Sequence, residues 1–177
     1  MERVYYPVLK RNRDKDYKNY IEIHIGLVKR AFDMYGALLC ACLGMDIEDL
    51  RALVLKHDES KFSEEEFEGY RKRFYPVDFE EELTDSSYEF QEAWIHHYKN
   101  NPHHPEYWVN EDGSIQEMED KYIAEMVLDW IAMGLYFGGT CYDFYWNKDR
   151  KEGLLGEKTR LKVEDILRTI KEYDSDH

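Results

Sequence analysis

Residues 115–137 read IQEMEDKYIAEMVLDWIAMGLYF, and Gly138 and Gly139 follow directly. The apolar residues of this run recur at intervals of three and four, which indicates an amphipathic helix rather than a strand. A glycine pair is typical of a helix end, because glycine readily adopts the left-handed conformation needed there. At 3.6 residues per turn, Asp129 lies on the apolar face, so its carboxylate is expected to point into the core. The same face carries Tyr122, Met126, Ala132, Met133 and Tyr136.

The same periodicity continues over most of the chain, whose 177 residues include 10 glycines and 4 prolines. No segment needs a strand to explain its pattern, so we expect an all-α fold. The length favours a single-domain bundle of about six to seven helices covering residues 1–177. We expect its core over about residues 17–137 and a C-terminal helical extension over about residues 140–172.

Capping signals predict where several helices begin and end. We expect a first helix from about residue 17 to residue 43, closed by Gly44, after an irregular lead-in. A second helix, capped near Asp46, is expected to carry His57 at its inner end and to stop near Lys61. Capping boxes predict further helices beginning near residues 64, 87 and 115. The three boxes are Ser63 with Glu66, Ser86 with Glu89, and Ser114 with Glu117.

The chain is strongly acidic, with 24 Lys and Arg against 38 Asp and Glu and a formal net charge of −14. This balance excludes a basic nucleic-acid scaffold, and an anionic substrate would need a local positive charge such as a metal ion. Cys40, Cys42 and Cys141 match no disulfide or metal pattern. No N-terminal apolar run resembles a signal peptide or a membrane span. We therefore expect a cytoplasmic protein with free thiols and no membrane partner.

Two imidazoles and two carboxylates are expected to face the interior. His24 lies on the apolar face of the first predicted helix, and His57-Asp58 follows an apolar helical run. Asp129 supplies the second inward carboxylate, and an ionised carboxylate in the interior is costly unless it is paired. For the His-Asp pair alone, Asp58 could instead cap a helix or meet an arginine. A divalent cation accounts for all four side chains at once, so we expect a metal site.

The order His24, His57-Asp58 and Asp129 on separate helices resembles the H…HD…D signature of the HD-domain superfamily. The resemblance covers about residues 17–137. It implies an all-α, metal-dependent protein, which in most members of the superfamily is a phosphohydrolase. It also implies that these four side chains are metal ligands.

Three further runs, HDESKF, EAWIHHYKNNPHHPEYW and EMVLDW, resemble a small uncharacterised family of bacterial and phage-encoded proteins. Lys61 completes an HDxxK run that recurs in the HD subgroups with two metals, including diiron oxygenases. In those proteins, additional histidines between the HD pair and the last aspartate hold the second ion, and the HD aspartate bridges the two ions. Four histidines occupy that interval in this chain: His96, His97, His103 and His104.

Helical phase separates the first pair of these histidines. On a helix from about residue 87 to residue 99, Phe90, Trp94 and His97 form one apolar stripe, and His96 lies outside it. We therefore expect His97 to be a metal ligand. His96 is expected to face solvent or a group next to a ligand.

The second pair is not expected on a regular helix, because Pro102 and Pro105 bracket it. A residue before proline is biased towards extended geometry, in which neighbouring side chains diverge. His103 and His104 should then not both bind one ion. We expect His104 to be a metal ligand, and His103 to be a catalytic group on the substrate side or an alternate ligand.

The resemblance implies hydrolysis of a phosphomonoester or a nucleotide-like small molecule. One or two ions of Mn²⁺, Fe²⁺, Co²⁺, Ni²⁺ or Zn²⁺ suit mixed imidazole and carboxylate ligation, and Lys61 is expected to neutralise charge that develops on the phosphoryl group. Glu125, one turn before Asp129, is a candidate partner of a ligand, a general base or an exposed carboxylate. Two alternatives are a diiron oxygenase of the HD type and a non-catalytic acidic binding protein stabilised by metal.

Overall fold

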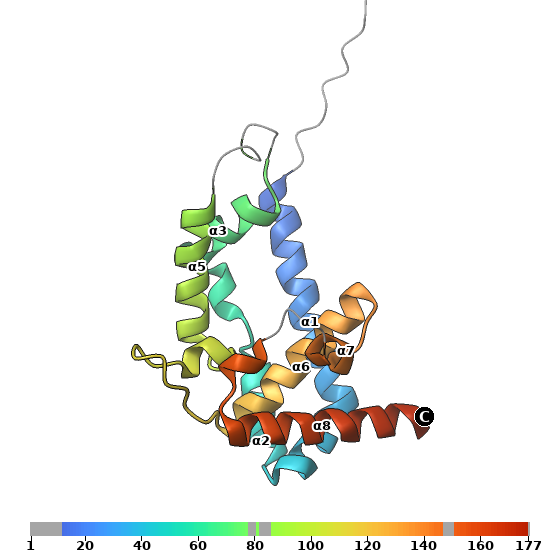
Figure 1. The fold of residues 1–177 in the computed structure, drawn as a ribbon. Coiled ribbons are helices and arrows are strands. Elements are labelled where there is room, and N and C mark those ends of the chain that lie inside the picture. The colour runs from blue at the N-terminus through green and yellow to red at the C-terminus, as the bar shows by residue number, and fades with distance from the viewer. Residues whose placement is uncertain (1–11, 78–80, 82–85, 147–150, 177) are drawn as a thin grey trace, which may run out of the picture.

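The computed structural model describes residues 12–77, 81, 86–146 and 151–176 (Figure 1). These residues form seven α-helices and three 3₁₀ helices, with no strand and one isolated antiparallel bridge between Val109 and Ile115. The predicted all-α bundle is confirmed. The α-helices are α1 (Arg13–Leu43), α2 (Ile47–Val54), α3 (Glu64–Phe74), α5 (Ser87–Asn100), α6 (Asp120–Phe137), α7 (Cys141–Trp146) and α8 (Glu157–Asp176). The 3₁₀ helices are η1 (Glu59–Phe62), η2 (Pro105–Trp108) and η3 (Lys151–Leu154).

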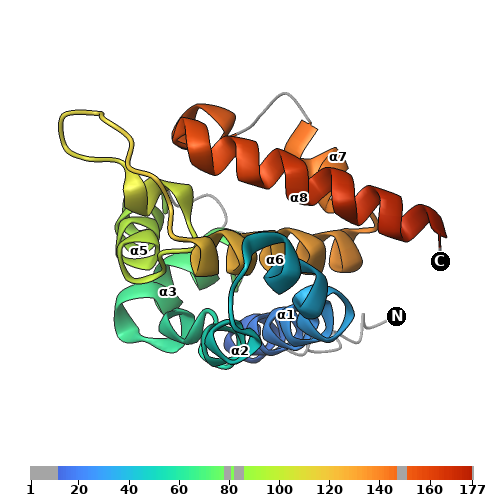
Figure 2. The same cartoon turned by 90° about the horizontal axis from the view of Figure 1, so that it is seen from below.

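Helix α6 lies in the middle of the bundle, between α8 on one side and α1 with α2 on the other (Figure 2). Helices α3 and α5 pack against each other at one end (Figure 1). The larger apolar core lies among α1, α2, α6 and α8, and a smaller one joins α1 to α3 and α5. On α1, His24 lies between Ile21 of the smaller core and Val28 of the larger core. The polar site therefore lies where the two cores meet.

Both glycine helix ends are confirmed, because Gly44 and Gly138 have φ values of 64° and 79° at the ends of α1 and α6. Helix α1 begins at Arg13, four residues before the predicted start. The reason is that the Asn12 side chain accepts a hydrogen bond from the backbone N–H of Lys15 and caps the helix. The rest of the predicted lead-in, residues 1–11, lies outside the described residues.

The predicted start of α6 is wrong by five residues, because the helix begins at Asp120. Ser114 does not cap it. Instead, the Asp112 carboxylate accepts hydrogen bonds from the backbone N–H and the hydroxyl of Ser114. Glu117 caps a different helix, since its carboxylate accepts from the backbone N–H groups of Lys158 and Thr159 at the start of α8. A local turn thus uses Ser114, and a tertiary contact uses Glu117.

The predicted starts of α3 and α5 are confirmed at Glu64 and Ser87. The capping-box hydrogen bonds are absent at both, because neither Ser63 nor Ser86 accepts a hydrogen bond from the helix through its side chain. All three cysteines are free, as predicted, and Cys42 is exposed whereas Cys40 and Cys141 are buried. Among the described helices, none is long and apolar enough to cross a membrane.

Helices α3 and α5 approach closely at Gly69, which gives a test of their packing. A Cβ atom at Gly69 would lie 2.5 Å from the backbone oxygen of Glu89 and 2.8 Å from Cβ of Ala93. We expect Gly69→Ala to lower the free energy of unfolding by about 1–3 kcal/mol, because the backbone of α5 must move. Urea unfolding followed by circular dichroism measures this difference.

Gly26→Ala is the matched control, because Gly26 is exposed on α1 and has nothing within 4 Å of the added Cβ. This variant should be neutral or more stable by up to about 1 kcal/mol, since alanine favours a helix. Equal stabilities for the two variants would contradict the close packing of α3 on α5.

Candidate metal centre

His57 and Asp58 lie in a tight turn between α2 and η1, not on a helix as the sequence analysis predicted. Helix α2 ends at Val54, and Asp58 adopts the left-handed conformation with φ 58°. Among non-glycine residues, aspartate and asparagine adopt this conformation most readily. The turn buries both side chains, since each residue is 1% exposed. It thus presents an imidazole and a carboxylate to the interior together.

The first group of possible metal-binding atoms comes from His24, His57 and Asp129, with Asp58 beside them. His24 Nε2 lies 3.1 Å from Asp129 Oδ1 and 3.3 Å from Asp58 Oδ2. His57 Nε2 lies 3.4 Å from His24 Nε2 and 3.6 Å from Asp58 Oδ2. With metal bonds of about 2.0–2.1 Å, neighbouring ligand atoms lie roughly 3.0–3.4 Å apart. The measured separations are close to that range.

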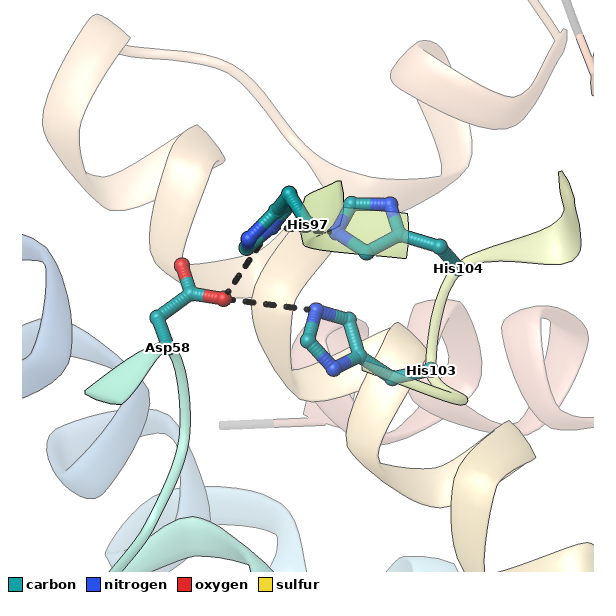
Figure 3. Close-up of side chains that lie close together, drawn as sticks. All are labelled: Asp58, His97, His103 and His104. Carbon is teal, nitrogen blue, oxygen red and sulfur yellow. Dashed lines mark hydrogen bonds and ion pairs between the residues drawn. The ribbon is translucent and has the colours of Figure 1, made fainter. Parts of the chain in front are cut away.

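The second group comprises Asp58, His97, His103 and His104, which each offer one atom within 4.8 Å of the others. His97 Nε2 lies 3.4 Å and His103 Nε2 3.6 Å from Asp58 Oδ1. His104 Nε2 lies 2.9 Å from His97 Nε2. Figure 3 shows the three rings gathered on one side of the Asp58 carboxylate. This side chain therefore faces the first group with Oδ2 and the second group with Oδ1.

Two observations indicate that a cation fits these groups. Asp58 Oδ1 and His103 Nε2 are buried and have no hydrogen-bond partner, which is uncommon for polar atoms in a protein interior. Four buried or largely buried carboxylates also lie in this region, and the Lys61 ammonium group contacts that of Asp58. The carboxylates are those of Asp58, Glu66, Glu125 and Asp129. Buried His, Asp and Glu side chains could thus hold a metal ion here.

The carboxylate of Glu125 contacts one histidine from each group. Its Oε1 accepts a hydrogen bond from His57 Nδ1 at 2.9 Å and lies 3.5 Å from His103 Nδ1. A histidine that donates through Nδ1 presents the lone pair of Nε2 to a metal. Glu125 is therefore the partner of two candidate ligands, which was one of the roles that the sequence left open.

Glu66 holds the first histidine pair in the same way, and the sequence analysis missed it. Its two carboxylate oxygens lie 2.8 Å from His96 Nδ1 and 2.8 Å from His97 Nδ1. Glu66 also fits a capping box with Ser63, and nothing in the local sequence distinguishes the two roles. His96 keeps 36% of its side chain exposed, whereas His97 keeps 1%. The helical phase therefore places the two rings as predicted.

The charge states of the second group are mixed, because burial acts to lower the pKa of His103 but its contact with Glu125 raises that pKa above the usual value. Burial is the main cause that lowers the pKa of His97 and of His104 below the usual value of histidine. Both imidazoles are therefore neutral. Burial raises the pKa of Asp58, but Lys61 and His57 lower it more, so this carboxyl group is ionised. Burial also acts to raise the pKa of Glu125, but hydrogen bonds from His103 and His57 bring it to about 2.

The prediction that the side chains of His103 and His104 diverge is wrong. Their ring centroids are 4.4 Å apart, and both belong to the second group. The backbone N–H of His104 donates to the carbonyl of Asn101 and closes a turn, so only His104 is extended. The turn brings His103 to the same side. Its ring is 2% exposed and lies among other ligand candidates, not on a surface that faces substrate.

Lys61 lies on η1 with its Nζ atom 2.7 Å from Asp58 Oδ2. About 15% of this side chain is exposed, compared with 2% for Asp58. The Asp129 side chain is 17% exposed. Lys61 and Asp129 are thus accessible from outside, while the carboxylate between them is not.

The sequence model of a family of unknown function, DUF5662, matches residues 13–169. The chain belongs to DUF5662. No curated protein and no solved structure matches it. All the candidate metal ligands of this DUF5662 protein, from His24 to Asp129, lie within the matched span.

Replacing Asp58 tests whether this DUF5662 protein binds metal through the shared carboxylate. We expect Asp58→Asn to lose most of the bound metal, because one anionic ligand of both groups is removed while the left-handed backbone conformation stays favourable. Inductively coupled plasma mass spectrometry of protein incubated with Mn²⁺ or Zn²⁺ gives the metal content.

Glu59→Gln is the matched control, because Glu59 is the next residue and is exposed. It should keep the wild-type metal content. A wild-type protein that stays metal-free and still unfolds cooperatively, or an Asp58→Asn variant with full metal content, would contradict this assignment.

Proposed function

We propose that the protein is a metal-dependent phosphohydrolase that cleaves a phosphomonoester at a site with two transition-metal ions. The single observation that carries the proposal is the Asp58 carboxylate, whose two oxygens face two separate groups of histidines. A carboxylate in that position can bridge two ions. The proposed first ion is held by His24, His57, Asp58 and Asp129. The proposed second ion is held by Asp58, His97, His103 and His104.

The ligand chemistry and the likeness to HD-domain proteins support this proposal together. Three separate parts of the sequence supply the signature residues His24, His57, Asp58 and Asp129. Five distances between their imidazole nitrogens and carboxylate oxygens, or between two imidazole nitrogens, are 3.1–4.0 Å. Mixed imidazole and carboxylate ligation suits Mn²⁺, Fe²⁺, Co²⁺, Ni²⁺ or Zn²⁺. Free thiols at all three cysteines support a cytoplasmic protein.

In the proposed reaction, a water oxygen bonds to phosphorus, the ester P–O bond breaks, and the leaving oxygen takes a proton to give an alcohol and inorganic phosphate. Bound divalent ions supply a water of lowered pKa and neutralise phosphoryl charge. Lys61 is accessible beside Asp58 and donates hydrogen bonds to a phosphoryl oxygen. Glu125 fixes the imidazoles of His57 and His103, so these ligands need no rearrangement during the reaction.

The direct test combines metal analysis with an assay on 4-nitrophenyl phosphate. Protein reconstituted with each candidate ion should release 4-nitrophenol and phosphate, and a chelator should abolish the release. Iron-dependent oxygen consumption without phosphate release would support the oxygenase instead. Stable metal binding with no turnover, together with salt-sensitive binding to a basic protein, would support the non-catalytic alternative.

Lys61 gives the first specific prediction of this function. We expect Lys61→Met to lower kcat by about a hundredfold, because one charged donor to the phosphoryl group is lost. Metal content should stay close to the wild-type value. Lys56→Met is the control, since Lys56 is exposed five residues earlier. Simultaneous loss of metal and of cooperative unfolding in Lys61→Met would mean that this lysine is structural.

The adjacent histidines give the second prediction. His97→Ala should reduce the metal content from two ions towards one, because the imidazole that faces Asp58 Oδ1 is removed. His96→Ala should keep both ions, since its ring contacts Glu66 and lies outside both groups. Metal stoichiometry and turnover of each variant test this difference. A reversed order of the two losses would overturn the proposed second site.

A further inference from the structure

A cavity of about 490 Å³ lies beside the proposed metal centre, between α1, α3 and α6. Among the described residues that line it, nearly all are aromatic, and Lys61 is the one charged side chain. The lining residues are Tyr17 and Tyr20 of α1, Lys61 of η1, Tyr70 and Phe74 of α3, Tyr75, and Met133, Tyr136 and Phe137 of α6. The volume suits a small organic group rather than a macromolecule.

The cavity reaches the metal centre at two accessible side chains. Lys61 lines the cavity and contacts Asp58 Oδ2. Met133, another lining residue, lies one helical turn after Asp129, whose side chain is 17% exposed. Tyr20 stacks on the His24 ring with centroids 6.4 Å apart. A ligand in the cavity can thus place an anionic group against Lys61.

The walls of the cavity suit a flat aromatic group. The rings of Tyr17 and Tyr70 are almost parallel, with 8° between their planes and centroids 6.4 Å apart. Tyr20 and Tyr136 meet edge to face at 5.5 Å. These rings contact one another, and they also line the cavity, so an aromatic ligand can add offset-stacked or edge-to-face contacts that an aliphatic ligand cannot make.

The cavity offers few polar groups to a ligand, because two of its tyrosines bury their hydroxyl groups. The hydroxyl groups of Tyr17 and Tyr70 are buried and have no hydrogen-bond partner among the described residues. None of the described lining residues carries a carboxylate or an amide side chain. Such groups commonly bind the hydroxyls of a sugar, so a polyhydroxylated ligand would leave most of its hydroxyls unpaired.

We propose that this cavity selects the substrate, and that the substrate is the phosphate monoester of an aromatic alcohol. The assignment rests on the proposed phosphohydrolase function. The aromatic ring occupies the tyrosine-lined cavity, and the single phosphate lies at Lys61 and the metal centre. A single lysine against the carboxylates nearby disfavours diphosphates and triphosphates, because the described part of the lining offers no second cation for their extra charge.

The experiment compares two phosphonates, which cannot be hydrolysed, by isothermal titration calorimetry on the Mn²⁺-loaded protein. Benzylphosphonate carries the aromatic ring, and methylphosphonate carries the same anionic group without it. We expect benzylphosphonate to bind at least about tenfold more tightly, because only its ring contacts the aromatic walls. In the Tyr136→Ala/Phe137→Ala double variant, this preference should fall to about twofold or less with unchanged metal content.

Phe144→Ala is the control, because Phe144 is an aromatic residue of α7 that is 52% exposed and does not line the cavity. Phe137 is 70% and Tyr136 42% exposed, so their replacement should leave the fold intact. Equal affinities for the two phosphonates, no binding of either, or a preference that survives the double variant would overturn the inference. A preference for benzylphosphonate in a protein that hydrolyses no phosphomonoester would support the aromatic cavity and overturn the phosphohydrolase function.

Discussion

The Asp58 carboxylate lies at the junction of the two apolar cores, and its burial constrains the elements around it. An ionised carboxylate in a protein interior is stable only where cations or hydrogen-bond donors surround it. Lys61 contacts one oxygen, and histidines from α1, α5 and the loop after α5 surround the rest of the group. The turn that carries Asp58 must therefore lie at one fixed position relative to these elements.

A second set of carboxylates extends this constraint outwards. Glu125 on α6 contacts His57 and His103, and Glu66 on α3 contacts His97. Each contact fixes the orientation of an imidazole through its Nδ1 atom and leaves Nε2 directed inwards. The network joins α3, α5 and α6 to the turn after α2. A group of polar side chains whose hydrogen bonds are shared in this way is rigid, which suits ligands that must keep their geometry.

Lys61 belongs both to the aromatic cavity, which it lines, and to the polar network, where it contacts Asp58. The network needs a cation beside Asp58, and the proposed substrate needs a cation for its phosphate. One lysine serves both needs because its Nζ atom has three donor hydrogens. Many of the 15 tyrosines in the sequence belong to the apolar core or to this cavity, where a phenol ring provides both aromatic surface and a hydroxyl group.

The sequence by itself determined the all-α class, the glycine ends at Gly44 and Gly138, and the inward direction of His24, His97 and Asp129. These features follow from local periodicity and backbone preference, which a single segment contains. Only the tertiary structure decided that Glu66 pairs with His97, that Glu117 caps α8 and that His103 and His104 face the same carboxylate. The two glutamate contacts join residues that are far apart in the sequence, 31 positions for Glu66 and His97. The arrangement of His103 and His104 depends instead on the turn that contains them. Local sequence carries no signal for such contacts, because the competing local role, a capping box or an extended pre-proline residue, has the same residue pattern.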